Sequence, residues 1–188
     1  GSFLEMMDRT GALRTAIKRI TMKNQNNMHL LIALLTIIMA FFGTLEGAYE
    51  EGIVYFLMFV PVILALGLDT VTAIMIVVLG TQIGCLSSVV NPFSTGIASG
   101  IAGISAGEGM IVRLVMFVLF TGIVIFIICR YADKVKAHPE KSVQFFRRHL
   151  DVDEFPAADD EDLTLSKPQN NALIVFCLTW VIMIIGLI

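Results

Sequence analysis

Long apolar runs, separated by short polar stretches, set the pattern of this chain. The runs are continuous rather than alternating, so they predict helices and not half-buried strands, and several approach the roughly 20 residues that cross a bilayer. We therefore expect an all-α integral membrane protein. The predicted elements are an amphipathic interfacial helix at 11–23, two apolar arms at 28–68, a broken helix at 71–105, a transmembrane helix at 109–131, a soluble linker at 132–171 and the start of another transmembrane helix at 172–188.

Polar residues interrupt the predicted helix at 71–105, where the chain should lie deep in the membrane. A proline inside a helix removes one backbone hydrogen bond and clashes with the preceding turn. In hydrocarbon, such irregular backbone persists only inside protein or beside a water-filled cavity. A polar, proline-broken helix is typical of a transport site, and its candidate residues here are Ser87, Ser88, Asn91, Pro92, Ser94 and Thr95.

Glycines at four-residue spacing flank this break, Gly80 with Gly84 before it and Gly96 with Gly100 after it. Small residues at this spacing let helix backbones approach closely, so we expect both halves of the helix to pack against protein. Plain helix packing without a ligand explains the glycines equally well. It does not explain the polar centre.

The two apolar arms at 28–43 and 53–68 enclose a polar tip at 44–52. Each arm has about 16 residues, short of the ~20 that a full span prefers. The arms form either a re-entrant hairpin, which enters the membrane and returns, or two ordinary short spans with the tip in water. Carboxylates in the tip are functional candidates if they lie at membrane depth and a solvated loop otherwise; they are Glu46, Glu50 and Glu51.

Composition and charge agree with a membrane protein. Hydrophobic residues make up 56% of the 188 and charged residues only 15%, against about a quarter in soluble domains. Five of the thirteen Lys and Arg residues lie within 1–23 and seven within 130–167. Because cytoplasmic segments carry the Lys and Arg excess, we expect 1–27 and 132–171 to be cytoplasmic, with an even number of crossings between them.

A broken helix presents two half-helix ends to a ligand. Free N–H groups expected near 94–96 suit an anion, and carbonyl groups near 84–86 suit a cation such as sodium. Asp69 or Thr70 is expected to cap the helix that leads to the break. The sequence shows no nucleophile–base pair, metal-ligand cluster or phosphate loop, so we expect neither an enzyme nor a cofactor, and we expect solvated positions for His29, His138 and His149.

Six short motifs follow one another in a specific order. They are Glu50-Glu51, Val60-Pro61, Leu66-Gly67-Leu68-Asp69, Thr81-Gln82-Ile83-Gly84, Asn91-Pro92-Phe93 and Gly100-Ile101-Ala102-Gly103. In order and spacing this series resembles the YfcC-type membrane proteins, which belong with the DcuC-like anaerobic dicarboxylate carriers of the ion-transporter superfamily.

The resemblance implies half of an inverted-repeat transporter of the bacterial inner membrane. This chain would be a fragment holding most of the first repeat, with the second repeat missing. The resemblance favours a re-entrant helical hairpin at 28–68, entering from the cytoplasmic side, followed by a discontinuous transmembrane helix. It also implies that the hairpin tip and the break at 86–95 meet around the substrate and a coupling ion, sodium or a proton.

We therefore predict an ion-coupled secondary active transporter, antiporter or symporter, that moves a small charged metabolite by alternating access. The resemblance leaves basic amino acids and dicarboxylates open. Three tip glutamates and the lack of any basic residue between Lys23 and Arg113 disfavour a dianion and favour a cationic amino acid, or a proton or sodium pathway through Glu50 or Glu51.

The alternative hypothesis is a non-transporting membrane scaffold or accessory subunit. Expected partners are membrane lipid, the small-molecule substrate, the missing second repeat and a second copy of the chain in a homodimer; nucleic acid is not expected.

Overall fold

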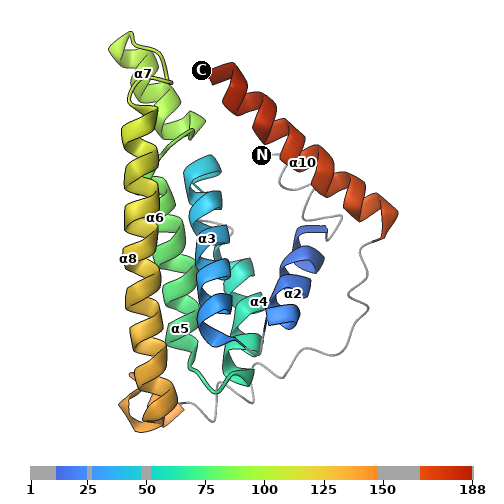
Figure 1. The fold of residues 1–188 in the computed structure, drawn as a ribbon, viewed down its shortest axis with the longest axis vertical. Coiled ribbons are helices and arrows are strands. Elements are labelled where there is room, and N and C mark those ends of the chain that lie inside the picture. The colour runs from blue at the N-terminus through green and yellow to red at the C-terminus, as the bar shows by residue number, and fades with distance from the viewer. Residues whose placement is uncertain (1–11, 25–26, 48–51, 148–165, 188) are drawn as a thin grey trace.

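A computed structural model describes residues 12–24, 27–47, 52–147 and 166–187, and within these ranges it contains helices and no strand (Figure 1). The α-helices are α2 (Ala12–Asn24), α3 (Met28–Glu46), α4 (Gly52–Ala65), α5 (Thr70–Ile74), α6 (Gly80–Ser87), α7 (Ile97–Ala102), α8 (Met110–Ala137) and α10 (Lys167–Leu187). The π-helical turn η1 (Met75–Leu79) continues α5, and a second π-helical turn, η2 (Pro92–Gly96), precedes α7. Two 3₁₀ turns, η3 (Pro139–Lys141) and η4 (Phe145–Arg147), follow α8.

Three segments of the described chain are long and apolar enough to cross a membrane. They are Met28–Leu45, Thr70–Ala102 and Met110–Ala137, and the shorter helix α4 is also apolar. In the described ranges the chain is therefore an all-helical membrane protein, as predicted.

Two helices extend beyond the apolar runs from which they were predicted. α8 continues through charged residues to Ala137, six residues past the predicted end at 131, and α10 begins at Lys167 rather than at 172. Hydropathy marks where apolar side chains end, whereas the backbone hydrogen bonds of a helix continue into polar residues such as Lys134 and Lys136. In α10 the added residues include Pro168, which the first turn of a helix accepts.

Glycine allows α3 and α6 to cross with their backbones almost in contact. A Cβ added to Gly84 would lie 2.0 Å from the carbonyl oxygen of Ala40, and one added to Gly43 would lie 2.1 Å from that of Thr81. A Cβ on Gly80 would meet the Cβ of Met39 at 2.8 Å. The close packing predicted at Gly80 and Gly84 is confirmed.

The second glycine pair does not behave in the same way. A Cβ on Gly100 would meet no atom of the described chain within 4 Å, and one on Gly96 would meet only atoms at 3.9 Å in the turn before it. The prediction of close packing at this pair is wrong for the described residues, because α7 extends beyond the end of α3 and no other described helix crosses it (Figure 1).

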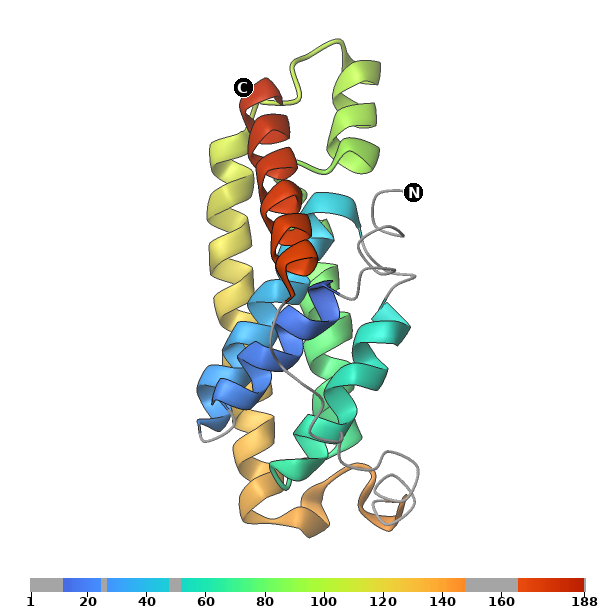
Figure 2. The same ribbon diagram turned by 90° about the vertical axis from the view of Figure 1, so that its right-hand side faces the viewer.

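The start of α3 and the end of α4 both lie beside the C-terminal end of α8. Near the start of α3, His29 Nε2 lies 2.8 Å from Asp133 Oδ1, and just after α4 the carboxylate of Asp69 accepts a hydrogen bond from the Tyr131 hydroxyl at 2.6 Å. Both views show α3 ending partway along α8, while α7 lies beyond it (Figures 1 and 2). The start of α3 and the end of α4 thus lie at the same end of α8.

We predict that Gly84→Ala lowers the thermal stability of the purified protein in detergent, because the added methyl group must displace backbone atoms at a cost of about 1–3 kcal/mol or more. Gly100→Ala is the matched control, since a methyl group there meets open space and alanine gains up to ~1 kcal/mol of helix propensity over glycine. Melting followed by size-exclusion chromatography measures both. Equal melting temperatures for Gly84→Ala and Gly100→Ala would contradict the close crossing.

Candidate substrate and ion site

The helical segment that begins at Thr70 breaks after Ser87. Ser88 follows with a left-handed backbone (φ 42°, ψ 52°), and among the described residues it is the one non-glycine residue with a positive φ. This conformation costs an L-residue about 1–2 kcal/mol, and such strained residues cluster at functional sites. Asn91 is extended (φ −63°, ψ 115°) because Pro92, which follows it, disfavours the helical region for the preceding residue.

Three hydroxyl groups meet across this break. Ser88 Oγ lies 2.5 Å from Ser94 Oγ and 2.7 Å from Thr95 Oγ1, and Thr95 Oγ1 also donates to the carbonyl oxygen of Ser88 at 2.6 Å. Each hydroxyl carries one proton. Since the Thr95 proton goes to the carbonyl, Ser88 donates to Thr95 and Ser94 donates to Ser88. This hydroxyl cluster therefore uses its protons internally, and the exposed Ser94 is left with oxygen lone pairs as acceptors.

Asn91 closes the start of the second half of the helix. Its Oδ1 accepts from the backbone N–H groups of Phe93 at 2.9 Å and Ser94 at 3.1 Å, and its carbonyl accepts from the N–H of Gly96 at 3.0 Å. The expectation that N–H groups near 94–96 are free for an anion is wrong for these groups, because Asn91 occupies the place that a bound anion would take. The hydroxyl cluster itself therefore offers acceptors, while the Nδ2 amide group of Asn91 remains a donor at the break.

The end of α3 lies against the break. Thr44 Oγ1 accepts a hydrogen bond from the N–H of Val89 at 2.8 Å. Gly47, the left-handed cap of α3 (φ 77°), is close enough to Asn91 that an added Cβ would lie 3.4 Å from its Nδ2. The end of the first arm and the break therefore meet, and Thr44 is a polar contact that the sequence alone did not single out.

The remaining candidates from the sequence lie in different settings. Ser87 is buried and donates at 2.8 Å to a carbonyl one turn earlier in its own helix, so its hydroxyl supports that helix. Pro92 is exposed at the first position of η2. Glu46 is the last residue of α3, but its side chain lies outside what the structure describes, as do Glu50 and Glu51 entirely.

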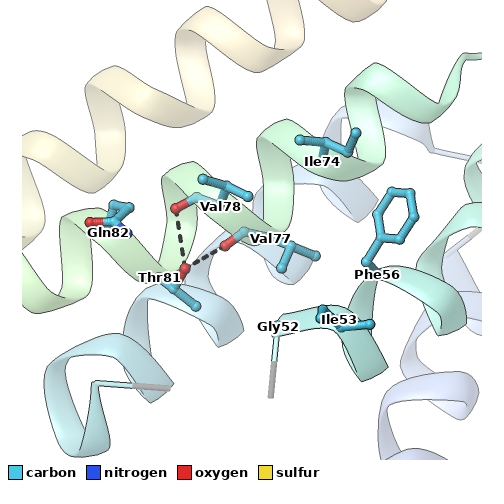
Figure 3. Close-up of a pocket in the computed structure, with 8 residues that line it drawn as sticks. All are labelled: Gly52, Ile53, Phe56, Ile74, Val77, Val78, Thr81 and Gln82. Carbon is cyan, nitrogen blue, oxygen red and sulfur yellow. Dashed lines mark hydrogen bonds between the residues drawn. The ribbon is translucent and has the colours of Figure 1, made fainter. Parts of the chain in front are cut away.

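An apolar pocket of about 210 Å³ lies between α4 and the η1–α6 segment, below the break. Figure 3 shows Phe56 and Ile53 on one wall and Ile74, Val77 and Val78 on the other, and Gly52, Thr81 and Gln82 complete the lining. Thr81 Oγ1 donates to the carbonyl oxygens of residues 77 and 78, at 2.7 and 3.1 Å, within its own helix. None of the described residues that line the pocket is charged, so this lining suits an apolar group.

A buried carboxylate lies between α4 and α5, away from the break. Asp69, which is 2% exposed, accepts from the Thr72 N–H at 3.0 Å and the Thr72 hydroxyl at 2.7 Å. It also accepts from the Tyr131 hydroxyl at 2.6 Å and the Ser142 hydroxyl at 2.5 Å. The predicted helix cap at Asp69 is confirmed, and the carboxylate also joins α5, α8 and the segment after α8.

Comparison with known proteins decides the family. The family model described as "DcuC: C4-dicarboxylate anaerobic carrier" matches residues 1–188. The chain belongs to the DcuC family. The resemblance read from the sequence motifs is thereby confirmed.

Two curated relatives of this DcuC-family chain are similar along most of its length. An uncharacterized protein of Haemophilus influenzae is 30% identical over 188 residues, which are 99% of this chain and 37% of the relative. A protein of Escherichia coli described as "Putative basic amino acid antiporter YfcC" is 32% identical over 162 residues, 83% of this chain and 32% of the relative. The chain thus spans about a third of the length of the curated relatives it matches.

No solved structure matches the chain. The descriptions of the family and of the Escherichia coli relative are of transport proteins. The prediction that the chain is not an enzyme is confirmed on that ground.

We predict that Asp69→Asn destabilises the protein by about 1–3 kcal/mol, because an amide N–H₂ replaces an oxygen that accepts from buried hydroxyls. Asp133→Asn is the control, since its pairing with His29 is exposed and exposed pairs contribute at most ~1 kcal/mol. Thermal melting in detergent measures the difference, and the rate of tryptic cleavage after the exposed Lys141 reports whether the neighbouring Ser142 has been released. Unchanged melting and cleavage in Asp69→Asn would show that this carboxylate does not hold the segment.

Proposed function

We propose that this chain is part of an ion-coupled secondary transporter that moves a small cationic metabolite, such as a basic amino acid, by alternating access. The observation that carries the proposal is the hydroxyl cluster at the break, whose protons are used internally so that oxygen lone pairs remain. Lone pairs of this kind suit ammonium or guanidinium donors and a sodium ion. They do not suit a carboxylate, which needs donors.

The charges along the chain support the same choice. No lysine or arginine occurs between Lys23 and Arg113, whereas three glutamates lie in and beside the tip. In a low-dielectric site these carboxylates attract a cation or carry a proton. Glu50 and Glu51 are therefore the proposed partners of the coupling ion or proton, with Glu46 beside them.

A dicarboxylate is the second candidate cargo, and the description of the family favours it. It requires cationic side chains that this chain does not supply between 24 and 112. The curated relatives are about three times as long as the matched region, so the rest of the protein has room for such residues. We propose that it also holds the second, inverted repeat.

We further propose that α3 and α4 form a re-entrant hairpin. α4 has 14 residues and measures about 21 Å, well short of the ~30 Å hydrocarbon core, whereas α3, with 19 residues and about 28 Å, is close to the length of a span. The end of α3 lies beside Asn91, with α7 still to follow, which supports a tip within the membrane. The cation clusters support cytoplasmic segments at 1–27 and 132–171 in a bacterial inner membrane, with α2 as the interfacial helix.

The first experiment uses the full-length protein in liposomes and measures uptake of labelled arginine, ornithine and succinate, with and without a sodium gradient. We expect accumulation of the basic amino acids, and loss of that accumulation in Asn91→Ala and in Glu50→Gln, because one variant opens the break and the other removes the ionisable group. Expression and melting temperature serve as controls for folding. Uptake of succinate alone would favour the dicarboxylate reading, and no uptake of any label would favour a scaffold or accessory subunit.

A sharper test concerns Ser94. We predict that Ser94→Ala raises the KM for a basic amino acid about tenfold with little change in maximal rate, because a hydrogen bond to a charged group contributes about 1.5–3 kcal/mol. Ser105→Ala, at another exposed serine, is the matched control. If KM is the same in Ser94→Ala, Ser105→Ala and the wild type, the outward oxygen of the hydroxyl cluster does not bind the cargo.

A further inference from the structure

The segment after α8 folds back onto the hairpin instead of trailing into solvent. Ser142 is buried and donates to Asp69 at 2.5 Å, and its Oγ accepts from the N–H of Gln144 at 3.2 Å. Thr70, at the start of α5, donates to the side chain of Gln144. The side chains of Asp69, which caps α5, and of Thr70, its first residue, thus hold a short stretch of this segment in one place.

The same stretch carries large apolar side chains that face outward. Val143 is 78% exposed and Phe146 is 87% exposed, and the ring of Phe145 meets that of Phe146 edge-on at 5.7 Å between centroids. We call these three residues the Phe146 surface. Because Ser142 and Gln144, which alternate with them, are tied to the hairpin, the Phe146 surface is held outward and has no described protein cover.

Cations surround the Phe146 surface along the chain. The stretch from 130 to 147 contains five basic residues and two acidic ones, and the basic residues are Arg130, Lys134, Lys136, Lys141 and Arg147. The acidic residues each face a histidine, Asp133 with His29 at 2.8 Å and Glu140 with His138 at 3.2 Å. The excess of positive charge therefore accompanies the exposed aromatic residues.

Helix length brings this segment to the membrane boundary. α8 has 28 residues and measures about 42 Å, roughly 12 Å more than the hydrocarbon core. Apart from Arg113 in its first turn, α8 carries no charged residue before Arg130, so the surplus lies at its C-terminal end. A segment that turns back from Ala137 to Asp69 returns toward the headgroups and does not leave them.

We propose that the Phe146 surface docks on the bilayer and that the neighbouring lysines bind anionic phospholipid headgroups. Phenylalanine and other apolar side chains beside lysine and arginine insert at the boundary between headgroups and acyl chains, and each lysine or arginine near an anionic surface adds to the attraction. The segment then anchors the end of α8 and, through Asp69, the base of the hairpin to the membrane surface. This docking site is separate from the candidate substrate site and does not depend on the cargo.

The test places a tryptophan at the Phe146 surface of the full-length protein. The Phe146→Trp variant is reconstituted into vesicles of brominated phosphatidylglycerol or brominated phosphatidylcholine, and its fluorescence is compared with that of the wild type. We expect lipid quenching of the difference signal, about twofold stronger in phosphatidylglycerol, together with weak quenching by acrylamide in the water. Phe126→Trp, a matched change at an exposed phenylalanine of α8, gives the signal of a side chain in lipid.

Charge is tested in the same vesicles with Lys136→Gln and Lys141→Gln combined in the Phe146→Trp background. We expect the preference for phosphatidylglycerol to fall toward unity while Phe126→Trp is unaffected. Strong acrylamide quenching without lipid quenching would show that the surface faces water and would overturn the proposal. Protection from both quenchers would show that another part of the protein covers it and would overturn the proposal equally. Equal quenching by the two lipids would overturn the recognition of anionic headgroups.

Discussion

The freed backbone between Ser87 and Pro92 is the constraint on which the rest of the structure depends. Lipid offers no partner to these N–H and C=O groups, so the protein must supply every partner itself. Asn91 caps the second half of the helix, Thr95 satisfies the carbonyl of Ser88, and Thr44 from the neighbouring arm accepts from Val89. Without the end of α3, the break would leave the Val89 amide without its partner. The end of α3 and the broken helix are therefore parts of one polar unit.

The glycine crossing makes that unit geometrically possible. Thr44 reaches Val89 only because α3 and α6 approach at Gly43 and Gly84, where a methyl group would collide with backbone atoms 2.1 and 2.0 Å away. In a membrane such close approach supplies the dispersion contacts that the hydrophobic effect does not. Packing that looks purely structural thus decides where the polar groups of the break lie.

The sequence predicted the place of the break and one of its glycine crossings, because proline, polar residues and the glycine spacing are local signals. It did not predict the role of Asn91, since residue type alone does not say whether an amide binds a ligand or caps a helix. Contacts between distant residues were also missed: Asp69 meets partners 62 and 73 positions away. The segment after α8 was predicted to be a soluble linker because it is rich in charged residues, and nothing in that pattern indicates that Ser142 is buried.

The polar groups around Asp69 and those at the break differ in how fully they are hydrogen-bonded, and the difference bears on the ion coupling proposed above. The carboxylate of Asp69 accepts four hydrogen bonds from three parts of the chain, so a passing ion would have to displace groups that hold the fold together. At the break, the hydroxyl cluster keeps acceptor oxygen available at Ser94. If the protein is ion-coupled as proposed, Glu50 and Glu51, which follow α3 in sequence, are better candidates for the carboxylate of the ion site than the buried Asp69.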